Sequence, residues 1–68
     1  MLRGRVKWFD NKKGFGFLTQ NRGLDVLVHF RALRGEVGWK SLRKGEDVLF
    51  EIERTVKGLR ATVVRRLP

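Results

Sequence analysis

The segment KGFGFL at residues 13–18 carries the pattern that decides the fold. On a β-strand, successive side chains point to opposite faces, so Phe15 and Phe17 share one face while Gly16 and Leu18 share the other. Glycine inside a strand often marks the close approach of another backbone or of a ligand. If Leu18 packs in a core, the two rings are exposed side by side; if the rings form the core, Leu18 is exposed. The six residues alone leave both arrangements open.

A first strand is predicted over residues 2–9 from the alternation of apolar and basic side chains. Simple alternation turns Trp8 toward the core and Phe9 toward the outside. The parity of Trp8 is shared by Leu2 and Val6, and that of Phe9 by Arg3, Arg5 and Lys7. Residues 10–14 then supply turn-forming side chains before a second strand over residues 15–20.

The third predicted strand covers residues 25–30 and follows a hairpin turn at residues 21–23, where Gly23 accepts a positive φ. Its two valines form the natural core face, so Leu27 and His29 point outward. If the rings of the second strand also face outward, one surface carries Phe15, Phe17, Leu27 and His29. Aromatic faces beside cations suit unstacked bases joined by phosphates.

The second half of the chain predicts two more strands. Residues 31–45 are broken by glycine and predict one helical turn followed by a long mobile loop. A fourth strand covers residues 47–54, and a turn leads to the last strand over residues 59–67. The core side of the fourth strand holds Val48, Phe50 and Ile52. Five short strands predict an all-β barrel, with residues 1–68 as one domain.

The charge of the chain favours a polyanionic partner. Its formal net charge is +9, from 16 Lys and Arg residues against 7 Asp and Glu. Nucleic acid is the first candidate and an anionic membrane surface the second. No amphipathic basic helix is present, so we expect no membrane partner. The plain alternative is that the basic surface serves solubility alone.

Catalysis and metal binding have little support in the composition. His29 is the only histidine and Ser41 the only serine, and no carboxylate pair flanks a plausible pocket. The chain has no cysteine, which excludes disulfides and thiolate metal sites and favours the cytoplasm. No signal peptide or membrane-spanning run is apparent. We therefore expect no enzyme activity, no cofactor and no small-molecule substrate.

Five ordered motifs along the whole chain resemble the bacterial cold-shock domain family. They are GRVKWF at residues 4–9, KGFGFL at 13–18, DVLVHF at 25–30, GWKSL at 38–42 and KG at 57–58. The resemblance implies a five-stranded antiparallel oligonucleotide-binding (OB-fold) barrel. It also implies a monomer that binds single-stranded RNA and DNA through exposed aromatic rings and acts as an RNA chaperone. The outward arrangement of the two phenylalanines is the one it favours.

The resemblance also implies a set of binding residues. The expected base-stacking residues are Trp8, Phe15, Phe17, His29, Phe30 and Trp39, with Phe9 nearby. The residues expected to contact phosphates or base edges are Lys7, Lys13, Lys40 and Lys57. Asp25 is expected to make a polar contact beside them. Trp8 and Phe30 lie on core parity, and a bulge in the first strand and a third strand that ends at Phe30 would reconcile them.

Several residues depart from the family's pattern. Leu27 stands in place of a stacking phenylalanine, which weakens one platform of the site. Trp39 replaces a phenylalanine, Leu59 a proline and Asp10 an asparagine, the last placing a negative charge near the platform. Family members are commonly acidic or near neutral, unlike this chain. Two other functions stay open: a basic protein-interaction barrel, and a charge-driven duplex DNA-binding protein.

Overall fold

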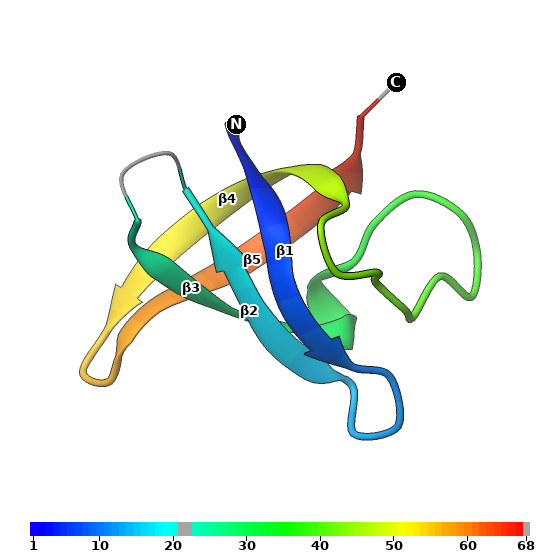
Figure 1. Cartoon of the computed structure of the whole chain (residues 1–68), viewed down its shortest axis with the longest axis horizontal. Coiled ribbons are helices and arrows are strands. Elements are labelled where there is room, and N and C mark those ends of the chain that lie inside the picture. Colours follow the sequence, from blue (N-terminus) through cyan, green and yellow to red (C-terminus); the bar gives the residue numbers. More distant parts are fainter. Residues whose placement is uncertain (21–22, 68) are drawn as a thin grey trace.

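Five strands and one short 3-10 turn make up the computed structural model, which describes residues 1–20 and 23–67 (Figure 1). The strands pair in the order β1-β2-β3-β5-β4, and β4 pairs with β1 to close the barrel. The predicted all-β barrel is confirmed. The elements are β1 (Leu2–Asp10), β2 (Phe15–Thr19), β3 (Asp25–His29), η1 (Phe30–Ala32), β4 (Asp47–Thr55) and β5 (Gly58–Arg66).

The strands of the barrel are not all antiparallel. β3 and β5 pair in parallel, while the other four pairs are antiparallel. Five strands in a closed ring cannot alternate in direction all the way round, because the number is odd. The long connection between η1 and β4 lies on the outside of the barrel (Figure 1), and β5, which follows β4, pairs with β3.

The core decides which way β2 faces. Leu18 is completely buried, and a Cβ at Gly16 would overlap the backbone of Phe9. Gly16 therefore allows β1 and β2 to approach closely, and the neighbouring phenylalanines of β2 lie half-buried on the outer face. The buried core consists of Val6, Leu18, Val26, Val28, Ala32, Leu33, Trp39, Leu42, Val48, Phe50, Ala61 and Val64, with Ile52 packed against it.

A β-bulge in β1 overturns simple alternation there. Val6 pairs with Leu18 and Trp8 with Phe17, so one extra residue stands between Val6 and Trp8 on β1. Trp8 is 40% exposed and Phe9 packs against the core, the reverse of what alternation predicts. The bulge that we expected is confirmed, since an inserted residue moves every later side chain to the opposite face.

The start of β1 and the end of β3 also differ from the prediction. Leu2 is exposed, although its parity predicts a core position. β3 ends at His29, one residue earlier than predicted, and Phe30 begins η1. In the hairpin turn before β3, Gly23 has a φ of +78°, while Asn21 and Arg22 of the predicted turn lie outside the described residues.

The loop between η1 and β4 is anchored to the barrel. Leu42 is buried, and the Asn11 side chain bonds both of its backbone groups: the Leu42 amide donates to Asn11 Oδ1 at 3.1 Å, and Asn11 Nδ2 donates to the Leu42 carbonyl at 3.3 Å. Leu33 forms an isolated bridge with Val64. The loop is as long as predicted, and these contacts fix it at separated points.

Candidate nucleic-acid interface

The bulge in β1 places an indole among the phenyl rings of β2. The ring centroids of Trp8 and Phe15 lie 5.8 Å apart at 71°, and those of Trp8 and Phe17 lie 5.5 Å apart at 57°. Tilted, edge-on contacts of this kind are favourable and do not bury the ring faces in one stack. The three rings form the centre of what we call the aromatic face, which consists of Trp8, Phe15, Phe17, Leu27, His29 and Phe30.

β3 extends the aromatic face by one strand. Phe15 is opposite His29, and Phe17 is opposite Leu27. Leu27 is 36% exposed, whereas the valines on either side of it are fully buried, as the alternation predicts. Residues directly opposite on paired strands lie close together, so each phenylalanine of β2 has a neighbour on β3.

Phe30 is held at the rim by the turn between β1 and β2. Its amide donates to the Gly14 carbonyl at 2.8 Å, and its ring centroid lies 4.5 Å from that of His29. Gly14 has a φ of +79°, and a Cβ there would overlap the Phe30 ring. Two separate constraints require glycine at this position: the left-handed backbone and the close approach of the Phe30 ring.

Cations surround the aromatic face on several sides. Lys7 Nζ lies 2.9 Å from Asp25 Oδ2, an exposed ion pair that joins β1 to β3. Lys40 Nζ lies 5.9 Å from the Phe30 ring centroid, and Lys13 belongs to the adjacent turn.

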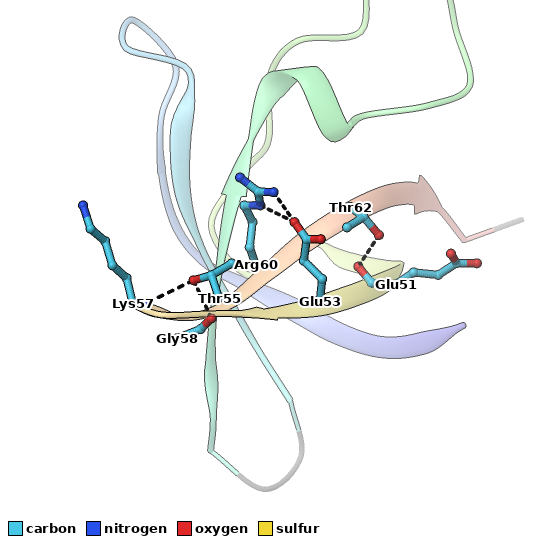
Figure 2. Close-up of polar contacts among 7 residues, drawn as sticks. All are labelled: Glu51, Glu53, Thr55, Lys57, Gly58, Arg60 and Thr62. Carbon is cyan, nitrogen blue, oxygen red and sulfur yellow. Dashed lines mark hydrogen bonds and ion pairs between the residues drawn. The ribbon is translucent and has the colours of Figure 1, made fainter.

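A further cation comes from the turn between β4 and β5. Lys57 lines one surface hollow with Phe17 and Leu27. Its amide donates to Thr55 Oγ1 at 3.1 Å, which shapes the turn, and its side chain extends away from the Glu53–Arg60 pair (Figure 2). The structure therefore brings Lys57 to the edge of the aromatic face from a distant part of the sequence.

Asp10 organises the turn that leads into β2. Its Oδ1 atom accepts from the backbone amides of Lys12 and Lys13, each at 2.9 Å. The hydrogen bond from the Lys13 amide is the main cause that lowers the pKa of Asp10 below its usual value; desolvation opposes it, and the Lys12 amide and the Lys13 charge lower the pKa further. The carboxylate thus has a local structural role beside the aromatic face.

The structure places two residues of the expected binding set, the stacking residue Trp39 and also Phe9, away from the exposed surface. Trp39 is only 9% exposed, and the Arg66 guanidinium lies 4.6 Å from its ring centroid. Its Nε1 atom is buried with no hydrogen-bond partner in the described chain. Phe9 packs against the core. The expectation of an exposed Trp39 ring is therefore wrong for this structure, because its large indole is buried in the core and covered by Arg66.

Comparisons with known proteins point to one family. The family model named 'Cold-shock' DNA-binding domain matches residues 2–67. The chain belongs to the cold-shock domain family. Cold shock protein CspB of Geobacillus stearothermophilus is 51% identical over 67 residues, which are 98% of this chain and 100% of the relative. Cold shock-like protein CspA of Shewanella violacea is 58% identical over 62 residues, 90% of this chain and 87% of the relative.

A cold shock-like protein of Thermotoga maritima is 50% identical over 64 residues, 94% of this chain and 96% of the relative. The resemblance found in the five motifs is thus confirmed, and with it nucleic-acid binding as the property of a non-enzymatic family. In residues 1–20 and 23–67, no three potential metal-ligating side chains cluster as a metal site would require. No helix in the described chain is long and apolar enough to span a membrane.

Sequence reasoning missed two residues that contribute to the surroundings of the aromatic face. Asn11 anchors the long loop, although its only sequence signal was its place in a turn. Arg60 lies directly opposite Leu27 through the β3–β5 pairing. No local pattern predicts that neighbour, because the two residues are distant in the sequence.

Proposed function

We propose that this protein binds single-stranded RNA and DNA and acts as an RNA chaperone. The observation that carries the proposal is the row of half-exposed rings, Trp8, Phe15 and Phe17, on one rigid pair of strands. Unpaired bases can stack on such rings whatever their sequence, while lysines near the rings meet the phosphates. A base inside a duplex cannot offer its face to these rings.

The binding residues follow from the same surface. Bases would stack on Trp8, Phe15, Phe17, His29 and Phe30, with Leu27 as an apolar contact. Lys7, Lys13, Lys40 and Lys57 would meet phosphates or base edges, and Asp25 would orient Lys7 through their ion pair. Phe9 supports the surface from the core side, and Trp39 lies outside it in this structure.

Chaperone activity would then arise from linkage. A protein that binds only the unpaired form shifts an RNA hairpin toward the open state by mass action. This needs no nucleotide hydrolysis, no metal and no cofactor. The proposal includes a monomer acting in the cytoplasm.

A fluorescence titration tests the proposal. The protein is titrated with oligo(dT), oligo(U) and a stable hairpin duplex at two salt concentrations. Trp8 is the exposed reporter, and a Trp39→Phe variant removes the buried indole signal. We expect quenching and tight binding with both single strands and much weaker binding with the duplex.

Two outcomes would favour the alternative functions. Equal affinity for duplex and oligo(dT) at the same salt would indicate a charge-driven duplex-binding protein. Absence of binding to any nucleic acid would favour the protein-interaction barrel.

A further inference from the structure

The outer surface that carries the aromatic face continues beyond β3. Leu27 of β3 lies opposite Arg60 of β5, and both side chains are exposed, so they share one surface. Next to this pair is a surface hollow between η1 and β5. It is lined by His29, Arg31, Ala32, Arg60, Ala61 and Thr62. His29 therefore belongs to both the aromatic face and the hollow.

Arg60 is oriented within the hollow by one carboxylate. Its Nε atom donates to Glu53 Oε2 at 2.8 Å, and its Nη2 atom contacts the same oxygen (Figure 2). The Arg60 side chain nevertheless remains 55% exposed. A guanidinium has five N–H donors, so a single carboxylate oxygen leaves most of them for another acceptor. Exposed ion pairs of this kind are weak, and an incoming anion can share the guanidinium.

Arg31 brings a second guanidinium to the hollow. Its backbone is fixed, because the Arg31 amide donates to His29 Nδ1 at 3.2 Å and its carbonyl accepts from Arg34 Nη1. Within the described part of the chain, its side chain has no hydrogen bond or ion pair. Since His29 Nδ1 is an acceptor, the neutral ring carries its proton on Nε2, which is a further donor.

These groups suit a phosphodiester. Two arginines line the hollow, and the carboxylate that contacts them is Glu53, bonded to Arg60, so the charge balance there is cationic. Guanidinium groups recognise phosphate oxygens with paired, charge-assisted hydrogen bonds. A strand whose bases stack as far as His29 would carry its next phosphates across the hollow.

We propose that the hollow between η1 and β5 binds the phosphodiester backbone of a nucleic-acid strand as it leaves the aromatic face past His29. The inference rests on the proposed function, because it extends the path of the same strand. It adds about two phosphate contacts, made by Arg31 and Arg60. A strand long enough to reach the hollow gains these contacts, and a shorter one does not.

A length series with paired variants tests the site. Oligo(dT) of about four and about ten nucleotides is used, and both lengths lie within the range of site sizes of such barrels, about 4–16 nucleotides. The test variant is Arg31→Gln/Arg60→Gln, and the matched control is Arg43→Gln/Arg65→Gln, which removes the same charge from exposed positions outside the hollow. Dissociation constants are measured at several salt concentrations, and circular dichroism verifies that each variant is folded.

The expected result concerns only the long strand. Each phosphate contact to a single strand contributes about 0.7 to the salt slope, so the test variant should lose about 1.4 for the longer oligomer. Its affinity loss between 50 and 200 mM salt should thus be about seven-fold smaller than that of the unmodified protein. The shorter oligomer should bind the test variant and the control variant alike.

Two results would overturn the inference while leaving the proposed function intact. One is an equal change in salt slope for the test and control variants, which would show that the overall positive charge of the protein, and not a site in the hollow, causes the salt dependence. The other is an equal change for both oligomer lengths. If the unmodified protein binds neither oligomer, the proposed function itself fails, and the inference fails with it.

Discussion

Phe17 and Leu27 lie directly opposite each other across the β2–β3 pair, with their side chains on the outer surface. One offers a flat ring and the other a branched aliphatic group. At this position the family resemblance implies a second ring. Leu27 can cover a base edge by apolar contact, but it has no π surface on which a base can stack.

Replacing Leu27 with phenylalanine should tighten single-strand binding. The gain should stay below the ~1–3 kcal/mol of a complete stacking interaction, because the leucine contact already exists. Stability should hardly change, since the position is on the outer face. Oligo(dT) affinity and melting temperature are the measurements, with Leu27→Met as a control that changes shape without adding a ring. A loss of roughly 1–3 kcal/mol of stability without a gain in affinity would indicate overpacking of a core position.

Removing a ring from β2 should weaken binding and leave the barrel folded. Phe15→Ala or Phe17→Ala should each cost ~1–3 kcal/mol of binding free energy to oligo(dT). The comparison is Leu18→Ala on the inner face of the same strand, which should cost ~2–5 kcal/mol of stability. Thermal melts and titrations of the three variants separate the faces. A phenylalanine variant as unstable as Leu18→Ala would contradict the outward arrangement.

Salt should weaken binding without abolishing it. If about four lysines engage phosphates, a slope of about 0.7 per contact predicts roughly a fifty-fold loss between 50 and 200 mM salt. That loss corresponds to ~2.3 kcal/mol, so stacking must supply most of the binding that remains. The check is a titration with oligo(dT) across that range. Complete loss of affinity at the upper concentration would show that charge dominates.

Gly14→Ala should destabilise the rim of the aromatic face. The left-handed backbone alone costs a residue with a Cβ about 1–2 kcal/mol, and the overlap with the Phe30 ring adds to this cost. Gly45→Ala is the matched control, because its φ is +85° but a Cβ at this position would have no neighbouring atom within 4 Å. Chemical denaturation should show a larger loss for Gly14→Ala. Equal losses would mean that the Phe30 contact contributes nothing.

The Asp10 carboxylate should support the fold only while it is ionised. Its pKa is lower in the folded chain than its usual value, so the stabilisation is present above the unfolded pKa and is lost as pH falls through the folded pKa. Asp10→Asn keeps an acceptor oxygen for both amides but cannot titrate. The variant should lose this part of the acid dependence of melting, and it should bind oligo(dT) more tightly because a negative charge is removed. An unchanged acid profile would contradict the assigned role.

Much of the fold followed from local sequence patterns. The valines of β3 and the alternation in β4 predicted buried faces, because a strand with one solvent-exposed face has apolar side chains at every second position. For the Phe15 and Phe17 pair, the residues alone left the direction open, and the family resemblance favoured the outer face. The burial of Leu18 agrees with that choice.

Other features depended on contacts between distant parts of the chain. The alternation of β1 could not show that Trp8 faces outward and Phe9 inward, because a bulge is set by pairing with β2. Trp39 resembled an exposed binding residue in its motif, yet the tertiary structure buries its indole beneath Arg66.

The sequence by itself thus determined the strands, the buried faces of β3 and β4 and the family, because these depend on side-chain periodicity and ordered motifs. Only the tertiary structure decided which residues become neighbours across the barrel. The parallel pairing of β3 with β5 places Arg60 beside Leu27, and the anchored loop leaves Trp39 in the core. The physical reason is that closing the barrel pairs strands that are distant in the sequence. No local pattern of residues predicts such a pairing.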